Sequence, residues 1–190
     1  MVKFVAVSGT HSSGKSTLVT DCRDLLQSRG SVVDVLSEVP RRVVTSLAQP
    51  DWLQVRNNAL WKQIYLLFVQ ASQELIAVRA SKADWVLLDR SVVDHLAYTL
   101  VLYADILGSA ELDEIRGQIA RHVEVYDFVA LVDPLGLMLD GVRDDDPAFQ
   151  ARMHESIEEL WDTLERPSDF RVPPLPALER AHALVSALHG

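Results

Sequence analysis

The segment from Gly9 to Ser16 reads GTHSSGKS and satisfies the pattern G-x-x-x-x-G-K-[ST] in full. Its two glycines let the backbone curl so that consecutive N–H groups converge on a space the size of a phosphate group. Lys15 can then reach the β- and γ-phosphates, while the hydroxyl of Ser16 can bind a magnesium ion. These residue types at this spacing predict binding of a nucleoside triphosphate with Mg2+.

The surroundings of the motif favour a phosphate loop over a glycine- and serine-rich turn that carries a lysine by chance. An apolar run, VKFVAV (2–7), precedes it directly, and an amphipathic pattern from Lys15 to about Arg29 follows it. A phosphate loop needs a strand before it and a helix N-terminus after it. The side chain of His11 is expected to project away from the phosphates and to fill space. The expected nucleotide-binding residues of the loop are Gly9, His11, Ser12, Ser13, Gly14, Lys15, Ser16 and Thr17.

A carboxylate and a guanidinium follow one another at the end of another apolar run, DWVLLD (84–89). A run that is apolar throughout its interior predicts a central strand covered on both faces. Asp89, at the end of that strand, suits the magnesium side of a bound triphosphate. An ATPase motor usually carries glutamate at the next position to polarise water, whereas Arg90 suits a second anion or a transferred phosphoryl group. A structural ion pair is the alternative role of Arg90.

Alternating apolar patterns predict the elements that position these groups. Short apolar runs predict strands at 2–7, 32–37, 84–89 and 127–132, with a short edge strand limited by prolines within 170–176. Apolar residues at spacings of three and four predict helices at about 15–29, 58–82, 92–107, 111–123, 147–165 and 177–188. In the helix at 58–82 these residues lie mostly on one side and include Leu67, Phe68 and Leu75. The alternation predicts an α/β fold with right-handed crossovers between parallel strands.

Four segments together resemble the P-loop nucleoside and nucleotide kinase superfamily. They are GTHSSGKSTL (9–18), SEVPRR (37–42), LLDRSVVDHLAYT (87–99) and DGVRDDDPAFQARMHESI (140–157). Within it, the chain is most similar to the small AAA-type ATP-binding family related to ribosylnicotinamide kinase domains, with thymidylate and deoxynucleoside kinases as cousins. The resemblance implies a three-layer P-loop NTPase fold, with a five-stranded parallel sheet flanked by helices. It also implies one domain over 1–190, a small lid at about 136–152, and ATP with Mg2+ beside an acceptor pocket.

The same resemblance implies roles for residues after the second strand. In deoxynucleoside kinases a glutamate at this place accepts the proton of the acceptor hydroxyl, and Glu38 stands there in this chain. Glu38 could instead be a solvated residue or a partner of Arg41 or Arg42, and Asp89 remains the other candidate for the base. Arg41 and Arg42 could each hold the acceptor, with a surface role expected for at least one of them. Arg90 is expected to contact the acceptor or the phosphoryl group.

The segment at 140–152 resembles the lid of these kinases, which closes over ATP and supplies arginines to the migrating phosphoryl group. Arg143 lies in the lid and Arg152 on the first turns of the following helix, so both are expected to reach the nucleotide. Asp144, Asp145 and Asp146 could hold the open lid through ion pairs, but capping of the helix before Pro147 is the preferred reading.

Recognition of the acceptor has weaker signals. Gln63 and Gln70 are seven residues apart, so their amides share a helix face and could read a base or a carboxamide. Aromatic side chains could stack on a ring, although ordinary core packing explains aromatics at helical spacing equally well. The aromatic residues concerned are Trp61, Tyr65, Phe68 and Tyr98. Packing explains His95 as well, although it matches the resemblance.

The formal net charge of −9 disfavours an extended nucleic acid as a partner. The acidity is uneven, because residues 1–43 carry a net charge of +2 and residues 140–169 one of −7. A compact triphosphate held by backbone N–H groups therefore remains compatible. The single cysteine, Cys22, excludes an internal disulfide, and no run resembles a signal peptide or a membrane span. We expect a cytoplasmic protein with no membrane partner, and the sequence leaves a homodimer open.

These observations favour ATP-dependent phosphotransfer to a small-molecule acceptor: a nucleoside, a nucleotide or a similar hydroxyl compound. No N-K-x-D or T-K-x-D tetrapeptide is present, so a GTPase switch is disfavoured. The alternative is an ATP-binding regulatory module, in which nucleotide orders the lid for a protein partner. A nucleic-acid end kinase would use the same chemistry but lacks the basic surface for its substrate.

Overall fold

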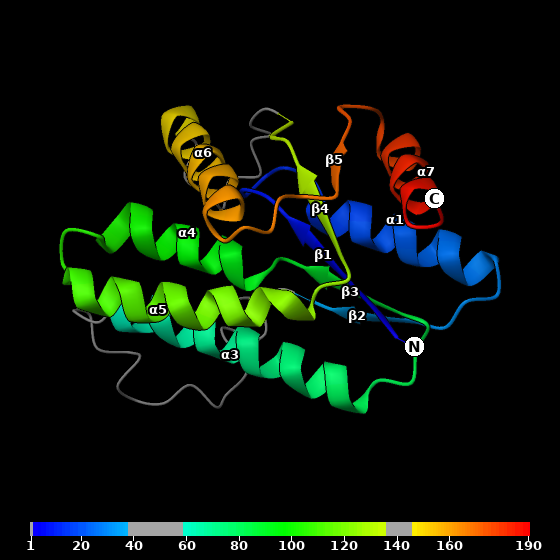
Figure 1. Cartoon of the computed structure of the whole chain (residues 1–190). Helices are drawn as coiled ribbons and strands as arrows, with labels where there is room; N and C mark the ends of the chain where they lie inside the picture. The colour runs from blue at the N-terminus through cyan, green and yellow to red at the C-terminus, as the bar shows by residue number, and fades with distance from the viewer. Residues whose placement is uncertain (1, 38–58, 136–145) are drawn as a thin grey trace.

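The structure is a computed structural model that describes residues 2–37, 59–135 and 146–190. Its centre is a sheet of five parallel strands in the order β2-β3-β1-β4-β5 (Figure 1). The strands are β1 (Lys3–Ser8), β2 (Val33–Leu36), β3 (Trp85–Asp89), β4 (Phe128–Val132) and β5 (Phe170–Val172). The five-stranded parallel sheet expected from the sequence is thereby confirmed.

The three central strands, β1, β3 and β4, are buried at every position after the first. Side chains alternate across a strand, so β1 contributes to two separate cores. Phe4 and Ala6 belong to one core, and Val5 and Val7 belong to the other. The edge strand β5 has only three residues and is followed by Pro173, which has no N–H to donate to a ladder.

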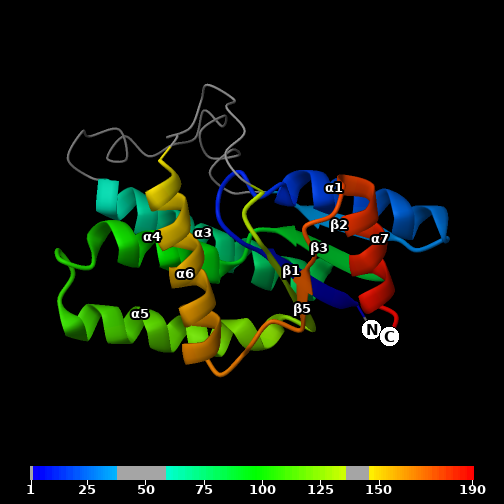
Figure 2. The same cartoon turned by 90° about the horizontal axis from the view of Figure 1, so that it is seen from above.

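Helices cover both faces of the sheet, as Figure 2 shows from above. One face packs against α1 (Lys15–Ser28) and α7 (Ala177–Ala187). The other packs against α3 (Ala59–Ala80), α4 (Val92–Tyr103), α5 (Ser109–His122) and α6 (Pro147–Thr163), with the short 3-10 turn η2 (Val123–Val125) after α5. The three-layer α/β arrangement expected from the sequence is confirmed.

The helix α3 buries only part of the face that its apolar pattern predicts. Its buried side chains are those of Leu66, Leu67, Gln70 and Glu74. Phe68, by contrast, is 45% exposed and lies outside the core. The apolar pattern does not indicate the two buried polar side chains, whose burial is supported by hydrogen bonds within the protein, although Oε1 of Gln70 has no partner among the described residues.

The helix α6 begins where the sequence predicts. The carboxylate of Asp146 accepts a hydrogen bond of 2.9 Å from the backbone N–H of Ala148 and caps the helix. Pro147 occupies the first turn, where a missing N–H leaves no helix bond broken. The capping role is therefore confirmed for Asp146, whereas Asp144 and Asp145 lie outside the described residues.

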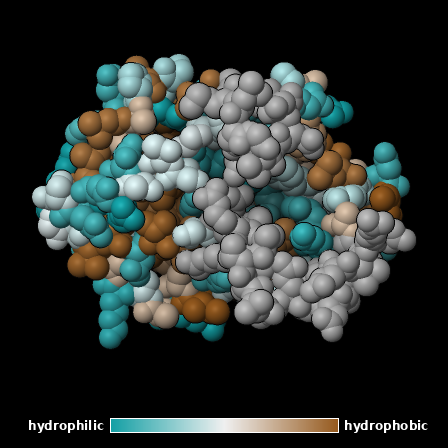
Figure 3. Space-filling model, turned by 180° about the vertical axis from the view of Figure 1, so that it is seen from behind, coloured by the Kyte–Doolittle hydropathy of each residue, from teal (hydrophilic) through white to brown (hydrophobic). Residues whose placement is uncertain are grey.

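The surface of the described residues is mixed in character. Figure 3 shows one face of the molecule, on which hydrophilic and hydrophobic side chains are interspersed. Within the three described ranges, no helix is both long and apolar enough to cross a membrane.

Candidate functional site

The phosphate loop occupies residues 9–14 between β1 and α1. Gly9 has φ +152°, and a Cβ at this position would lie 2.6 Å from the carbonyl oxygen of Val132. Gly14 has φ +79°, in the left-handed region that favours glycine, and it directly precedes α1. Both glycines of the motif are therefore required, one by a close approach of backbone and one by the turn into the helix.

The side chain of Lys15 is buried within the loop. Its ammonium donates hydrogen bonds to the carbonyl oxygen of Thr10 and, at 3.2 Å, to Oγ of Ser13. Ser16 and Thr17 are exposed at the start of α1, where the helix dipole favours an anion. The loop and the first turn of α1 thus bring together a cation, exposed hydroxyl-bearing residues and a helix N-terminus.

The register of the sheet places Asp89 and Arg90 next to this loop. Asp89 is paired with Val7 on the neighbouring strand β1, and the backbone N–H of Arg90 donates to the carbonyl oxygen of Val7 at 3.2 Å. Arg90 has φ +95°, which is unusual for a residue other than glycine. Its guanidinium lies over the ring of Tyr98, 5.4 Å from the centroid. The guanidinium of Arg90 therefore points away from the end of β3 and toward α4.

Asp94 connects the phosphate loop to the turn after β3. One oxygen of its fully buried carboxylate accepts from Oγ of Ser8 at 2.6 Å and from the backbone N–H of Gly9 at 3.0 Å. The other accepts from the backbone N–H of Ser91 at 2.9 Å. Burial raises the pKa of Asp94, while the charges of Lys15 and Arg90 act in the opposite direction.

Asp94 was not assigned a role from the sequence, although a local signal for it exists. The pattern Ser91-Val92-Val93-Asp94 is a capping box, in which the first and last side chains bond each other's backbone N–H groups. That pattern shows where α4 begins. The bonds to Ser8 and Gly9 cross about 85 positions of the chain and could not be read from it.

Gln70 and Glu74, both fully buried on α3, hold the same turn from the other side. The amide nitrogen of Gln70 donates to the carbonyl oxygen of Arg90 at 3.3 Å and to Glu74 at 2.7 Å. Glu74 also accepts from the hydroxyl of Tyr126 at 2.7 Å, and that hydroxyl accepts from the backbone N–H of Val92 at 3.2 Å. The amide nitrogen of Gln70 is thus engaged by protein groups rather than facing an acceptor.

The remaining residues proposed for the acceptor lie at different depths. Gln63 is half-buried and donates to the carbonyl oxygen of His95 at 3.2 Å. The ring of His95 is buried, and burial, followed by the charge of Arg90, lowers its pKa to about 3. Trp61 is 57% exposed on α3, so core packing does not describe it. Tyr98 on α4 contacts the Arg90 guanidinium through its ring.

The ring of His11 packs between α4 and α6. Its Nδ1 is 3.0 Å from the hydroxyl of Tyr98, and the ring stacks on Phe149 with centroids 5.7 Å apart. Arg152 is exposed, and its guanidinium lies 5.9 Å from the centroid of Phe149. Gln150 donates from the same helix to the carbonyl oxygen of His11 at 3.0 Å. The beginning of α6 therefore contacts the phosphate loop directly.

Four residues proposed from the sequence, Glu38, Arg41, Arg42 and Arg143, lie outside the described residues. Two others that touch the loop were not found from the sequence. Gln150 falls in the segment that resembles a lid, but its type gave no signal. Arg180 on α7 donates to the carbonyl oxygen of Ser13 at 3.2 Å, and no local pattern marks it.

Comparisons with known proteins agree with this arrangement. The family described as an AAA domain (AAA_28) matches residues 4–169 of the chain. No curated protein sequence matches it.

Solved structures share the fold at low sequence identity. A deoxyadenosine kinase from M. mycoides, with the products dCMP and dCDP bound, has a TM-score of 0.66 and 15% identity, and the match covers 98% of each chain. The same kinase with bound dATP has a TM-score of 0.64 and 16% identity over 98% of this chain and 100% of that one. A thymidylate kinase from Ehrlichia chaffeensis has a TM-score of 0.62 and 14% identity over 100% of this chain and 99% of that one. The fold is therefore that of P-loop nucleoside and nucleotide kinases, as the resemblance predicts.

Proposed function

The chain belongs to the AAA domain family AAA_28, and on that premise we propose that it is an ATP-dependent phosphotransferase. Its acceptor would be a nucleoside, a nucleotide or a similar small hydroxyl compound, and the domain would span residues 1–190 with a lid at about 136–152. The observation that carries the proposal is the pairing of Val7 with Asp89, which sets Asp89 and Arg90 beside the phosphate loop. The loop would hold the triphosphate, while the strand end would act on the group that is transferred.

Within this proposal, the ATP-binding residues are those of the loop and the first turn of α1. Lys15 would leave the carbonyl oxygen of Thr10 to bind the β- and γ-phosphates, since a phosphate oxygen is the stronger partner for an ammonium group. Arg143 and Arg152 would approach from the lid side. The full proposed set is Gly9, His11, Ser12, Ser13, Gly14, Lys15, Ser16, Thr17, Arg143 and Arg152.

The residues at the site fit Mg2+. The hydroxyl of Ser16 is exposed at the helix start, and Asp89 follows the strand next to the loop, so both supply the hard oxygen ligands that this ion prefers. No cluster of three or more His, Cys, Asp or Glu that could hold a metal occurs in the described part of the chain. Such a site relies on phosphate oxygens and water for its other ligands, as Mg2+ sites in kinases do. When bound, the ion would offset negative charge on the phosphates.

The acceptor would lie on the side of Arg90 and Tyr98. We propose that Arg90 contacts the acceptor or the migrating phosphoryl group, and that Gln63, Arg41 and Arg42 contribute to the acceptor pocket. Either Glu38 or Asp89 would take the proton of the attacking hydroxyl. The contact between Arg90 and Tyr98 supports this assignment, since it directs the guanidinium toward α4.

An acceptor screen tests the proposal. ADP release is measured with ATP and Mg2+ across a panel of nucleosides, nucleotides, nicotinamide riboside and short oligonucleotides. We expect at least one small acceptor to raise ADP release above that with ATP alone, and Lys15→Met to abolish the increase. Lys82→Met is the control, because Lys82 is exposed and follows the end of α3. Slow hydrolysis that responds to no acceptor would contradict the kinase and favour the regulatory module.

A further inference from the structure

We propose that Arg180, with Gln150, holds the phosphate loop in the shape that receives a triphosphate, and that the charge of Arg180 makes the site favour nucleotides with more phosphate groups. This inference rests on the proposed nucleotide binding but not on transfer to an acceptor. Both residues are positioning residues, since they contact the loop rather than the reacting atoms.

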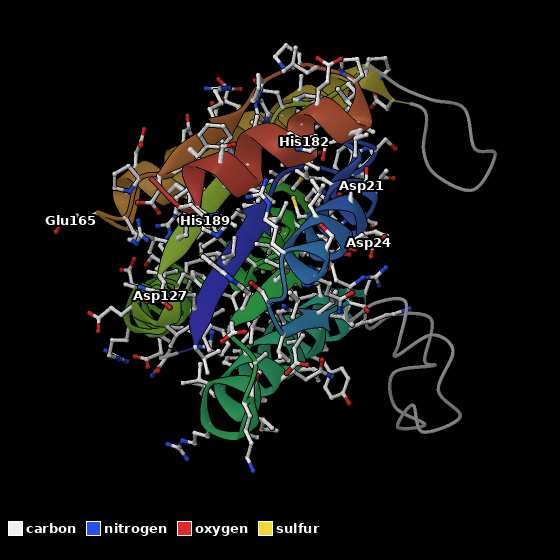
Figure 4. The ribbon with its side chains drawn as sticks, turned by 90° about the vertical axis from the view of Figure 1, so that its right-hand side faces the viewer. Asp21, Asp24, Asp127, Glu165, His182 and His189 are labelled. Atoms are coloured by element: carbon white, nitrogen blue, oxygen red, sulfur yellow. The ribbon has the colours of Figure 1, made fainter. Side chains whose placement is uncertain are left out.

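Two carbonyl groups of the loop are held by side chains from helices late in the chain. Arg180 on α7 is 2% exposed, and its Nη2 donates to the carbonyl oxygen of Ser13 at 3.2 Å. Gln150 on α6 is 5% exposed, and its Nε2 donates to the carbonyl oxygen of His11 at 3.0 Å. Figure 4 shows α7, which carries His182, lying along α1, the helix that follows the loop. The loop is therefore fixed from α6 and from α7.

These contacts orient the N–H groups that follow. In a trans peptide the carbonyl and the next N–H point in opposite directions. When Arg180 holds the carbonyl of Ser13 toward α7, the N–H of Gly14 points away from α7. When Gln150 holds the carbonyl of His11 toward α6, the N–H of Ser12 points away from α6. In the proposal, both N–H groups lie on the side of the bound phosphates, where convergent N–H groups bind an anion.

The charge of Arg180 is poorly compensated. Among the described residues, no carboxylate oxygen lies within 4.0 Å of its guanidinium, and its Nε has no hydrogen-bond partner. Burial lowers the pKa of Arg180, and Asp133 offsets this only in part. The carboxylate of Asp133 is itself paired with Arg171 at 2.8 Å. A buried cation without a paired anion is costly, so an anion bound in the adjacent loop would supply the missing compensation.

The guanidinium of Arg180 packs closely against the phosphate loop. A Cβ on Gly14 would lie 3.1 Å from Nη1 of Arg180, so the guanidinium lies directly against the last glycine of the loop. A bound triphosphate would sit on the other side of the same short peptide segment. Because Arg180 is itself buried, its charge is screened less than that of a surface residue.

Two substitutions separate the charge from the hydrogen bond. Arg180→Gln keeps a donor for Ser13 but removes the charge, whereas Arg180→Lys keeps the charge. Affinities for ATP, ADP and AMP are measured by calorimetry, together with the thermal midpoint of the nucleotide-free protein. Arg116→Met is the control, since it removes an exposed positive charge from α5.

We expect Arg180→Gln to weaken ATP binding by about 10-fold or more, ADP binding less, and AMP binding by about 2-fold at most. Arg180→Lys should keep most of the preference for ATP. The midpoint of the nucleotide-free Gln variant should not fall, because an uncompensated buried charge has been removed. Equal losses for all three nucleotides, or loss of the preference in the Lys variant, would overturn the inference. If the Gln variant does not fold, the inference also fails, because the charge of Arg180 would then be needed for folding even without a nucleotide.

Gln150 provides an uncharged comparison. Gln150→Leu removes the donor to His11 without changing charge, so we expect a loss of about 3- to 10-fold that is similar for ATP and ADP. A loss graded by phosphate number in this variant would contradict the assignment of that preference to the charge of Arg180. If the wild-type chain binds no ATP, this inference and the proposed function both fail. If it binds ATP with the expected dependence on Arg180 but phosphorylates no acceptor, only the proposed function fails.

Discussion

At the scale of single residues, Arg90 has a strained backbone conformation that sets the direction of its side chain. Its φ of +95° lies in a region where a side chain is strained, yet the conformation turns the guanidinium toward Tyr98. Hydrogen bonds on both sides maintain it, because its N–H donates to Val7 and its carbonyl accepts from Gln70. A residue held this firmly in an unfavourable conformation is typical of a functional position.

The strain at Arg90 can be measured by comparing two truncations. Arg90→Ala and Arg90→Gly both remove the guanidinium and its contact with Tyr98, so their difference isolates the backbone. We expect the glycine variant to be more stable by about 1 kcal/mol in urea unfolding, while both lose turnover with an acceptor. Equal stability of the two variants would show that the turn is unstrained.

A second prediction at this scale concerns His95, whose pKa is lowered to about 3 by burial and then by Arg90. The folded protein therefore binds fewer protons than the unfolded chain between about pH 3 and the ordinary histidine value of about 6.5. The contribution of His95 to the free energy of unfolding is fully present above this pH range and is lost as the pH falls through it. Between pH 7 and pH 4 the wild type should lose about 2 to 3 kcal/mol more unfolding free energy than His95→Leu.

The control for His95 is His182→Gln, since His182 is exposed on α7. Urea unfolding at a series of pH values gives the comparison. The dependence of stability on pH should be unchanged by the control. If His95→Leu keeps the full acid dependence of the wild type, another group is responsible.

At the scale of elements, Glu74 joins α3 to the segments that carry the turn after β3. Its carboxylate accepts from Gln70 and Tyr126 and lies 2.6 Å from Nε2 of His122 at the end of α5. Burial, followed by Glu74, raises the pKa of Tyr126 well above its usual range, so the hydroxyl stays a donor. One carboxylate thus stabilises the packing of three elements around the Arg90 turn.

Removing that carboxylate should be costly. Glu74→Ala removes the acceptor of Tyr126 and of His122 and one of the two acceptors of the Gln70 amide, and we expect it to lower the free energy of unfolding by about 3 kcal/mol or more. Glu114→Ala on the exposed face of α5 is the control, with an expected change within about 0.5 kcal/mol. Both are measured by urea unfolding. A cost for Glu74→Ala as small as that of the control would show that water replaces the lost bonds.

At the scale of the whole molecule, the phosphate loop is where the layers meet. It receives bonds from α4 through Asp94, from α6 through Gln150 and from α7 through Arg180. A ligand in the loop should therefore stabilise the protein as a unit rather than one segment. At ATP concentrations 100-fold above its dissociation constant, binding contributes about 2.7 kcal/mol.

Thermal unfolding tests that coupling. We expect ATP with Mg2+ to raise the midpoint of the wild type by about 5 to 10 °C at that excess. Lys15→Met should abolish the shift, and Lys82→Met should retain it. A shift that survives Lys15→Met would place the nucleotide elsewhere.

The parts of this architecture that local patterns predict are those made by neighbouring residues. The phosphate loop needs glycines, a lysine and a helix start within eight positions, and the sequence contains all of them. The strand ending at Asp89 and the capping of α6 by Asp146 are local in the same way. Such features follow from backbone conformation and short-range hydrogen bonding, so the order of strands and helices along the chain could be predicted.

Contacts between distant positions could not be predicted in this way. Gln150 meets His11 across 139 positions and Arg180 meets Ser13 across 167. The burial of Glu74 on α3 could not be predicted for the same reason, since its partners Tyr126 and His122 lie on other elements. Hydrophobic periodicity assumes that polar side chains face water, and that assumption fails where a network satisfies them.

The indole of Trp161 gives the phosphate loop an optical reporter. Trp161 is 1% exposed, and its N–H donates at 2.9 Å to Oγ of Ser8, the residue before the loop. Ser8 in turn donates to Asp94, which also accepts from Gly9. The hydroxyl of Ser8 therefore links the start of the phosphate loop to the indole, and we expect a change of conformation there to alter the emission of Trp161. The chain has three other tryptophans, Trp52, Trp61 and Trp85, so replacing each of them with phenylalanine would leave Trp161 as the sole indole whose intrinsic fluorescence follows nucleotide binding.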